Sequence, residues 1–549
     1  MILGVDIGGT HTDAICIKTG TIINSAKVTT DKENLVGSIV GAINELDIDL
    51  PKIDRIVLST TLSTNAIIEK KYGLTGMIAS AGPGIDPKNY FLTDNFYLVD
   101  GAIDHRGREY VPINRDQITT VAGKLKDKGI TGVGIVSKFS VRNPLHEESI
   151  YNLISNDFSY ISLGHQMSGN LNFSRRINTT YFNTAVMPTQ DVFMKSVSGA
   201  LGKLGIMPQI LFLKADGGTY MASAANRLPV ETIMSGPAAS IMGGAALNKD
   251  KGASLVLDIG GTTTDIGLLV DGVPVMEPLG VSIGGAKTLV RGLNVLSVGA
   301  GGDSRVYTKR DKLFVGPQRD GPPAAMGGKS PTPTDALAIL GVLDFGDAKK
   351  AEHALSPLAH AMGKDLKDLA KDILTTLAKG IKQASASFID ELNTKPVYTI
   401  HEMLHQELIR PDRVIIIGGP ARNLKPYIAD VFDIPCIVPE YCEVANALGA
   451  ALARTTAQIT IMADTQMRRL VCPEIGIEKE IPSHYSMDDI KTFGIKALKD
   501  NASYLGLTDA LDVDVVEAQS FNMVRGFSTA GKNMRLKIQS TPGIIPEWR

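Results

Sequence analysis

The sequence predicts an α/β protein with a duplicated domain and a small α+β region at its C-terminal end. Short apolar strands alternate with helical segments along most of the chain, which is typical of parallel sheets connected by helices. The stretch "DIGGTHTDAICIKTG" at Asp6–Gly20 also returns as "DIGGTTTDIGLLVDG" at Asp258–Gly272, and eight of the fifteen positions are identical. We interpret this local repeat as an internal duplication of a domain.

Composition argues against several classes of protein. A chain of 549 residues is long enough for two or more domains. Its formal net charge of −2 gives no electrostatic reason for binding to nucleic acid or to an anionic membrane. The four cysteines form no C-x-x-C pair, which argues against a disulfide framework and an iron–sulfur site. No apolar run has the length of a membrane span and no signal peptide opens the chain, so we expect a cytoplasmic protein.

Residues 1–185 predict the N-terminal half of the duplication. Three short strands fill the first 29 residues, and the turns between them contain Gly-Gly-Thr and Thr-Gly. A helix is predicted over 35–46, followed by the apolar strand "DRIVLST" and a helix that Gly73 ends. The strands "TGVGIVSKF" and "SYISLGHQ" flank the helical segment "NPLHEESIYNLI".

Residues 186–455 predict the second half, with a Gly/Pro-rich insertion at about 281–345. A long helix is predicted over 364–392, because apolar residues recur there near helical spacing. The run "DRVIIIGGPARNLKPYIADVF" predicts a buried strand, a Gly-Gly turn and a helix, and "VANALGAALA" predicts a helix that can pack very closely. Residues 456–549 form the α+β region, with a polar helix near 487–504 and two strand-like runs.

The first "DIGGT" stretch combines groups that suit a phosphate and a cation. Asp6 lies at the end of a buried strand, where an unpaired carboxylate is costly. Gly8 and Gly9 let the backbone turn sharply and expose N–H groups, and Thr10 adds a hydroxyl, so together they can form an anion cradle. Because a carboxylate repels a phosphate, this combination implies a Mg²⁺ ion between them.

The second copy offers Asp258, Gly260, Gly261 and Thr262 in the same order. One copy alone is better explained as a glycine hairpin in a sheet. Two copies on facing domains would place two cradles across one cleft, which suits a nucleoside triphosphate with Asp6 and Asp258 as metal ligands. Asp13 and Asp265 repeat as well, and either a structural hydrogen bond or a metal contact explains them equally.

Other candidates lie outside the repeat. Thr61 and Asn65 belong to a polar cluster just before a helix, where an N-cap cluster and a substrate or phosphate loop are equally good explanations. The run "GAGGD", with Gly299, Gly301 and Gly302, favours close approach to a ligand over a plain loop. His105 and Arg106 lie in a turn, for which a solvated turn is the simpler explanation and a substrate contact the alternative.

The paired hairpins and the late Gly-Gly turn resemble the actin/sugar-kinase/Hsp70 ATPase superfamily, which implies duplicated actin-like (ribonuclease-H-like) domains flanking a nucleotide cleft. More specifically, the chain resembles the ATP-dependent hydantoinase/oxoprolinase family. The stretches that carry this second resemblance follow the family's order through about residue 455 and include "STTLSTNAIIEKKYG", "GAIDHRGREYVPI", "SGPAAS", "LNVLSVGAGGDSRV", "PTPTDALAILG" and "VANALGAALA".

The resemblance implies ATP and Mg²⁺ as cofactors and a role for each of the glycine-rich turns. Asp6 and Asp258, with Thr10 and Thr262, are the expected catalytic residues. The expected nucleotide contacts are Gly8, Gly9, Gly260, Gly261, Thr264, Gly299, Gly301, Gly302, Gly418 and Gly419, and the expected substrate contacts are Thr61, Asn65, His105 and Arg106.

The implied activity is the opening of a cyclic amide such as a hydantoin or 5-oxoproline. The γ-phosphoryl group passes to the carbonyl oxygen, water attacks the carbon, and phosphate leaves. The alternatives are a carboxylase-type subunit, a small-molecule kinase of the same superfamily, and a non-enzymatic actin-like or chaperone-like ATPase. An ATP-driven reductive activator would need clustered cysteines, which the sequence lacks. We further expect a separately encoded second subunit and an oligomer.

Overall fold

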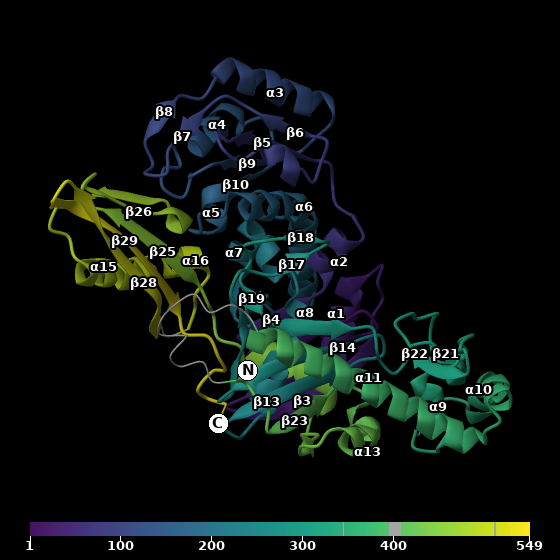
Figure 1. The fold of residues 1–549 in the computed structure, drawn as a ribbon. Helices are drawn as coiled ribbons and strands as arrows, with labels where there is room; N and C mark the ends of the chain where they lie inside the picture. Colours follow the sequence, from purple (N-terminus) through teal and green to yellow (C-terminus); the bar gives the residue numbers. More distant parts are fainter. Residues whose placement is uncertain (344, 395–407, 510–511, 549) are drawn as a thin grey trace.

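Two similar mixed sheets form the centre of the protein. The computed structural model describes residues 1–343, 345–394, 408–509 and 512–548 (Figure 1). The first sheet has the order β12-β11-β4-β1-β2-β3. Its strands are β1 (Ile2–Ile7), β2 (His11–Lys18), β3 (Thr21–Thr29), β4 (Arg55–Thr60), β11 (Gln209–Leu213) and β12 (Thr219–Met221). The three strands predicted for the first 29 residues are therefore present.

The second sheet repeats the arrangement of the first and has the order β15-β14-β13-β23-β24, with β20 also paired to β14. Its strands are β13 (Ala253–Ile259), β14 (Thr264–Val270), β15 (Val273–Pro274), β20 (Val295–Val298), β23 (Arg413–Ile417) and β24 (Cys436–Ile437). In both sheets the repeated sequence forms an antiparallel hairpin whose first strand pairs in parallel with a later strand. The predicted duplication is thus present as two α/β domains with the same arrangement of strands.

Two helices rich in small residues pack between the sheets. They are α8 (Ser235–Leu247) and α14 (Ala445–Leu452), and α14 also lies against β1. The contact is close because glycines meet backbone: a side chain on Gly449 would overlap the backbone of Gly243, and a side chain on Gly4 would overlap that of Ala447. The close packing predicted for "VANALGAALA" is therefore present, and it holds the two halves together.

A separate parallel sheet is inserted between β4 and β11, with the order β10-β9-β5-β6 (top of Figure 1). The inserted elements are α2 (Leu62–Ile68), β5 (Thr75–Ser80), β6 (Phe96–Leu98), β7 (Ala102–Ile103), β8 (Glu109–Val111), α3 (Arg115–Asp127), β9 (Gly132–Ser137), α4 (Leu145–Ile154), β10 (Tyr160–Leu163) and α5 (Gly164–Met167). The helix α6 (Phe173–Lys203) then leads back to the first sheet. The expected boundary at residues 185 and 186 falls inside α6, and the first half continues to β12, because β11 pairs with β4.

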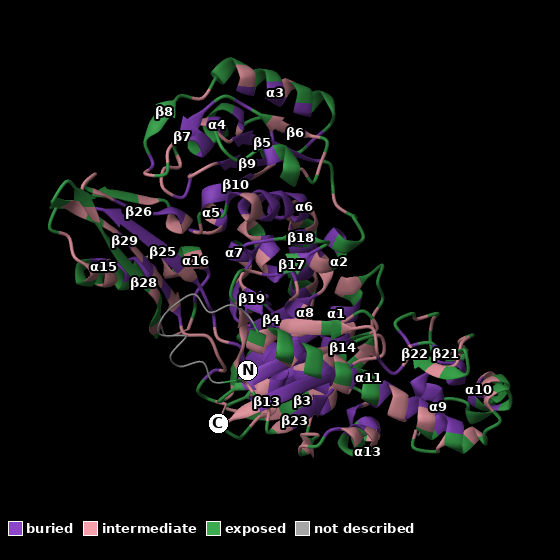
Figure 2. Ribbon diagram, viewed as in Figure 1, coloured by how far each residue is buried: buried purple, intermediate pink, exposed green. Residues whose placement is uncertain are grey.

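Helices cover both central sheets. In the first half, α1 (Leu35–Glu45) and α7 (Ala222–Arg227) share a core with the sheet. In the second half, α11 (Leu366–Thr394) and α13 (Ala421–Val431) pack on the other sheet. The helices α9 (Pro333–Ile339) and α10 (Ala348–Met362) pack against α11 and extend the same core. Figure 2 shows the strands at this centre as buried, in agreement with the exposures of Val5, Leu257 and Ile416, which are all 0%.

The Gly/Pro-rich segment at about 281–345 contains short hairpins rather than a domain of its own. Its strands and those just before it are β16 (Met276–Glu277), β17 (Ser282–Ile283), β18 (Ala286–Lys287), β19 (Gly292–Leu293), β21 (Val306–Lys309) and β22 (Lys312–Val315). They form three two-stranded pairs, β16 with β19, β17 with β18, and β21 with β22.

The C-terminal region is a five-stranded antiparallel sheet with the order β27-β26-β25-β29-β28. It contains β25 (Gln458–Asp464), β26 (Arg469–Cys472), β27 (Ile477–Glu480), β28 (Val513–Arg525) and β29 (Ser528–Ser540), and the helices α15 (Met487–Asp500) and α16 (Ala502–Leu505). The two predicted strand-like runs are β28 and β29. No helix among the described residues combines the length and apolar character needed to cross a bilayer.

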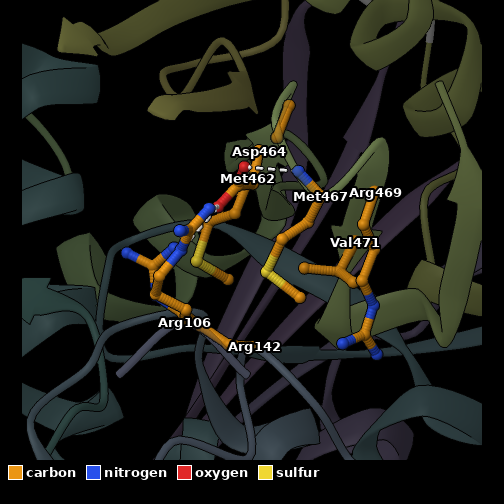
Figure 3. Close-up of a pocket in the computed structure, with 8 residues that line it drawn as sticks. Arg106, Arg142, Met462, Asp464, Met467, Arg469 and Val471 are labelled. Carbon is orange, nitrogen blue, oxygen red and sulfur yellow. Dashed lines mark hydrogen bonds and ion pairs between the residues drawn. The ribbon is translucent and has the colours of Figure 1, made fainter. Parts of the chain in front are cut away.

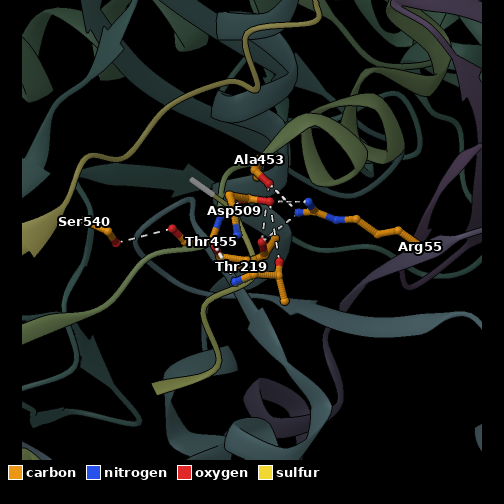
Figure 4. A network of polar contacts seen from close by, with 7 residues as sticks. Arg55, Thr219, Ala453, Thr455, Asp509 and Ser540 are labelled. Carbon is orange, nitrogen blue, oxygen red and sulfur yellow. Dashed lines mark hydrogen bonds and ion pairs between the residues drawn. The ribbon is translucent and has the colours of Figure 1, made fainter. Parts of the chain in front are cut away.

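A buried arginine joins the C-terminal region to the first sheet (Figure 4). Arg55 at the start of β4 forms an ion pair with Asp509 at 2.9 Å and donates to the carbonyl oxygen of Ala453 at 2.9 Å. It also contacts the hydroxyl of Thr219, and the Thr455 N–H donates to the Asp509 carboxylate at 2.6 Å. Because breaking a buried pair is costly, these contacts fix the C-terminal region against the edge of the first half.

Candidate functional site

The first "DIGGT" turn connects β1 to β2. Asp6 is the second-last residue of β1, and the Gly8 N–H donates to the carbonyl oxygen of His11 at 3.0 Å, which closes the turn. The sequence suggested that this N–H group is exposed for a phosphate, but in the structure it is already used within the turn. The exposed tip is Gly9, where an added Cβ would meet no atom within 4 Å. Gly9 and Thr10 are the residues of this turn that can face a ligand.

The second turn reproduces the first. The Gly260 N–H donates to the carbonyl oxygen of Thr263 at 2.9 Å, so it also closes the hairpin. In the first hairpin Asp6 lies opposite Asp13 in the ladder, and in the second Asp258 lies opposite Asp265. The two hairpins thus present the same groups in the same register.

The two turns meet through Asp6 and Asp258. Burial, together with the negative charges of Asp13 and Asp258, raises the pKa of Asp6 to about 7, although Ser59 and Asn446 act in the opposite direction. Asp258 accepts hydrogen bonds from the Ser240 hydroxyl at 2.6 Å and from the Asn446 amide at 3.0 Å. Asn446, at the start of α14, therefore binds Asp258 and also favours the charged form of Asp6.

The second aspartates of the hairpins differ in their surroundings. Asp13 forms an ion pair with Lys27, with distances of 2.7 and 2.9 Å from Nζ to the two carboxylate oxygens. Asp265 accepts a hydrogen bond from Ser297, and burial and the charge of Asp258 raise its pKa to about 7. Asp13 is accordingly a structural residue, whereas Asp265 adds to the uncompensated negative charge beside Asp258.

The "GAGGD" loop packs on the second turn. A Cβ on Gly301 would lie 2.6 Å from the carbonyl oxygen of Gly260, and one on Gly299 would lie 2.6 Å from the Pro317 side chain. These two glycines allow close approach between protein segments, which replaces the ligand contact expected for them. The Thr264 hydroxyl is buried as well and donates to the Ala300 carbonyl oxygen, so it supports this loop.

The same loop introduces charged residues that the sequence interpretation did not select. The Gly302 N–H donates to the Gly260 carbonyl oxygen at 2.9 Å, which positions Asp303 beside the turn. Asp303 forms an ion pair with Arg319 at 2.9 Å, and Arg319 also donates to the Thr262 hydroxyl at 3.2 Å. The sequence signal for Asp303 was the glycine-rich run just before it. Arg319 has no comparable signal of its own in the sequence.

The charges of this loop reach the first hairpin. Burial and the positive charge of Lys27 lower the pKa of His11, and Asp303 and Arg319 from the second half also act on it. His11 begins β2 beside the first turn and Arg319 donates to Thr262 of the second, so Asp303 and Arg319 lie near both hairpins.

The late Gly-Gly turn lies directly beside Asp258. Gly418 has a φ of +99°, and a Cβ there would lie 2.6 Å from the Asp258 Oδ1. Only glycine meets both conditions without strain. Gly419 faces open space, and α13 begins two residues later. The predicted strand, turn and helix are thus present, and Gly419 rather than Gly418 is free to approach a ligand.

The polar cluster before α2 lies against the start of α8. Thr61 is the N-cap of α2 without a side-chain cap bond, and its hydroxyl accepts from the Asn65 amide at 3.1 Å. The Ser235 hydroxyl donates to the Thr60 carbonyl oxygen at 2.9 Å, and an added Cβ on Gly236 would lie 3.5 Å from Thr61. Thr61 and Asn65 therefore lie at the carboxyl end of β4, next to the end of β1.

His105 and Arg106 lie elsewhere, between β7 and β8. Arg106 forms an ion pair with Asp464 of the C-terminal sheet at 2.6 Å (Figure 3) and donates to Gln466 at 2.9 Å. His105 is exposed. The structure brings neither residue to the two turns, and Arg106 instead joins the inserted sheet to the C-terminal region.

The carboxylates of the two turns fit a divalent cation. Asp6, Asp258 and Asp265 are buried or nearly so, and none of them has an ion-pair partner among the described residues. No group of three or more His, Cys, Asp or Glu side chains gathers as a metal site in the described part of the chain. A Mg²⁺ ion held by one or two carboxylates, with its other ligands from phosphate and water, matches this donor set.

The raised pKa of Asp265 predicts a pH-dependent cost to stability. Its carboxyl binds a proton up to about pH 7 when folded but only to about pH 3.8 when unfolded, so the free energy of unfolding falls as the pH rises between these values. Asp265→Asn should therefore raise the unfolding free energy at pH 8 by at least about 1 kcal/mol. Urea titrations without nucleotide or Mg²⁺ at pH 5 and pH 8 measure this, and an equal effect at both pH values would contradict it.

Comparison with known families adds independent findings. Residues 2–158 match the family model "Hydantoinase/oxoprolinase N-terminal region", and residues 176–459 match the model "Hydantoinase/oxoprolinase". Together they cover both halves of the duplicated fold.

Similar curated proteins come from several organisms. An uncharacterized protein of Methanocaldococcus jannaschii is 26% identical over 82% of this chain and 72% of its own length. The caprolactamase subunit alpha of Pseudomonas jessenii is 24% identical over 70% of this chain and 62% of its own length. The acetophenone carboxylase gamma subunit of Aromatoleum aromaticum is 23% identical over 87% of this chain and 70% of its own length. The chain thus spans about two thirds of these relatives.

Two solved structures share the fold. Nucleotide-free acetone carboxylase aligns with a TM-score of 0.71 and 17% identity over 100% of this chain and 88% of its own. The ATP-dependent caprolactamase from Pseudomonas jessenii aligns with a TM-score of 0.71 and 18% identity over 98% of this chain and 87% of its own. At this identity the likeness establishes the architecture.

Proposed function

Because the chain belongs to the hydantoinase/oxoprolinase family, we propose that it is an ATP-dependent enzyme that opens a cyclic amide by phosphorylating its carbonyl oxygen. The observation that carries the proposal is the pair of facing turns, in which Asp6 and Asp258 interact across the two halves. Each turn also presents an exposed or half-exposed glycine and a threonine, namely Gly9 with Thr10 and Gly261 with Thr262.

An amide carbonyl is a poor electrophile, and transfer of the γ-phosphoryl group of ATP to its oxygen gives an imidate phosphate and ADP. Water then adds to the carbon, the ring C–N bond breaks, and the nitrogen takes a proton and leaves as an amine. Hydrolysis of the resulting acyl phosphate releases inorganic phosphate and a carboxylate. The protein's contribution is to position the reactants and to stabilise charge during phosphoryl transfer.

Specific residues suit these tasks. The N–H groups of Gly9 and Gly261 and the hydroxyls of Thr10 and Thr262 can hold phosphate oxygens. Asp6 and Asp258 can hold Mg²⁺, which when bound would neutralise phosphate charge. Arg319 donates to Thr262 and lies beside the second turn, so it adds positive charge where the transferred phosphate would develop negative charge.

A second candidate reaction is ATP-dependent carboxylation. It is favoured by the likeness to the acetophenone carboxylase gamma subunit and to acetone carboxylase. Two relatives are named as subunits, which supports a separately encoded partner for this chain as well. The expected cytoplasmic location and oligomeric state stay proposals.

One assay separates these possibilities. The protein, with and without the product of a neighbouring gene, is incubated with ATP, Mg²⁺ and a panel of hydantoins, lactams, 5-oxoproline and ketones, with and without bicarbonate. We expect phosphate release that matches ring opening of one cyclic amide. Consumption of bicarbonate with a ketone would establish the carboxylase instead. A stable phosphorylated product would indicate a kinase, and phosphate release independent of substrate would indicate a filament or chaperone ATPase.

A further inference from the structure

A second group of buried charged side chains lies where the first sheet meets the C-terminal region. These residues line a cavity of about 100 Å³, between the loop that joins β11 to β12, helix α7 and the start of β25. Its charged lining residues are Lys214, Asp216, Arg227, Glu231, Arg291 and Glu474. A water molecule needs only about 10–15 Å³ on this scale, so the cavity has room for a small organic molecule.

The cavity lies at a functional edge of the fold. β1, β4 and β11 run parallel, so their carboxyl ends share one edge of the sheet. Lys214 immediately follows β11, as the first turn follows β1 and Thr61 follows β4. In α/β sheets, ligands bind outside the carboxyl ends of the parallel strands. None of the residues that form the two turns lines this cavity, so it is a site apart from them.

Positive charge exceeds what Asp216 can satisfy. Lys214 is 5% exposed, and its Nζ lies 3.2 Å from the Asp216 carboxylate. The Arg291 Nε lies 3.6 Å from the same carboxylate, which also accepts from the Gly218 N–H and the Thr456 hydroxyl. The Arg291 Nη1 is buried and has no hydrogen-bond partner among the described residues. A buried, unpartnered guanidinium N–H is costly unless a ligand supplies its acceptor.

The Glu231 carboxyl group does not supply the acceptor that the Arg291 guanidinium lacks. None of the hydrogen bonds and ion pairs in the described part of the chain involves its carboxyl group, and burial raises its pKa to about 7, while Lys214 and Arg291 lower it and Asp216 raises it. Near neutral pH the carboxyl is thus partly protonated, and the site keeps its excess of positive charge.

The remaining charged groups that line the cavity are engaged elsewhere. The guanidinium of Arg227 lies 3.7 Å from the centre of the Tyr504 ring and donates to the Tyr504 carbonyl oxygen. Glu474 accepts hydrogen bonds from the backbone N–H groups of Gly169 and Thr460. Arg291 and Lys214 are therefore the donors that a ligand would meet.

We infer that this cavity binds a small organic carboxylate, with the Arg291 Nη1 and the Lys214 Nζ as donors. A planar carboxylate matches the geometry of a guanidinium, and the cavity is large enough for a compact carbon skeleton but not for a nucleotide. The site goes beyond the proposed ATP-dependent reaction and does not depend on it, because the binding needs neither ATP nor a cyclic amide.

Isothermal titration calorimetry without nucleotide tests the site, with acetate, propionate, succinate and inorganic phosphate as probes. At least one carboxylate should bind the wild-type chain with a stoichiometry of one and more tightly than phosphate. Arg291→Gln should weaken this binding by at least about tenfold, because hydrogen bonds to charged groups contribute more free energy than hydrogen bonds between neutral groups. Arg291→Lys should keep part of it. Arg310→Gln, at an exposed arginine in the β21–β22 turn, should leave it unchanged.

A second measurement uses pH. Affinity for the carboxylate should fall severalfold between pH 6 and pH 8, because Glu231 ionises over this range and adds negative charge. Glu231→Gln should bind more tightly at pH 8 and show a flatter pH profile, and it reports on the site even if Arg291→Gln folds poorly. Absence of carboxylate binding, equal binding by folded Arg291→Gln, or preference for phosphate would each overturn the inference.

Discussion

Replacing Asp258 with alanine is expected to lower the rate of ATP-dependent phosphate release by at least about 10²–10³-fold. A loss of this size is typical when a group that stabilises charge in a transition state is removed. Asp258 is the second-last residue of β13, lies beside the late Gly-Gly turn and accepts a hydrogen bond from Asn446. Its loss removes a carboxylate from the meeting point of both halves. Phosphate release under saturating ATP and Mg²⁺ measures the effect.

Two comparisons separate charge from packing. Asp258→Asn keeps an oxygen that can accept the Ser240 hydrogen bond but removes the charge, so it should be nearly as inactive as the alanine variant. Glu352→Ala, at an exposed position of α10, should release phosphate at the wild-type rate. Thermal unfolding should be little changed in all three variants. Turnover at the wild-type rate by Asp258→Ala would exclude a task for this turn in phosphoryl transfer.

The largest effect on stability is expected for Gly449→Val. Gly449 lies in α14 where a side chain would overlap the backbone of Gly243 in α8, so the two helices would have to move apart. Such overpacking should lower the free energy of unfolding by about 3 kcal/mol. Urea denaturation followed by circular dichroism measures this, and the midpoint should shift strongly.

Gly380→Ala is the matched control for helix propensity. Gly380 is an exposed residue of α11, and an added Cβ would meet no atom within 4 Å. Alanine there should stabilise the protein by up to about 1 kcal/mol, because it favours the helix. If Gly449→Val were as stable as Gly380→Ala, the close contact between α8 and α14 would be refuted.

The glycine-rich segments show how far local patterns reach. The sequence correctly indicated close packing for "VANALGAALA", whereas for "GAGGD" it indicated close approach to a ligand. It could not name the neighbour. In both segments the neighbour is another part of the chain, namely the turn at Gly260 and the helix at Gly243.

The charged residues show the opposite case. His105 and Arg106 were candidate substrate contacts in the sequence. In the structure, however, the Arg106 guanidinium forms an ion pair with Asp464, far along the chain. Arg319, Asn446 and Ser240 were not expected at the site, although Ser240 and Asn446 lie within the family-like stretches "SGPAAS" and "VANALGAALA". They contact the two turns only after the chain has folded.

The sequence by itself determined the duplicated hairpins, the strand–turn–helix at Gly418 and the α/β class, because turn chemistry and apolar periodicity act between near neighbours in the chain. Only the tertiary structure decided that Asn446 donates to Asp258 and that Lys214 and Arg291 converge on one cavity. Those contacts join residues separated by tens to hundreds of positions, and no local spacing encodes them.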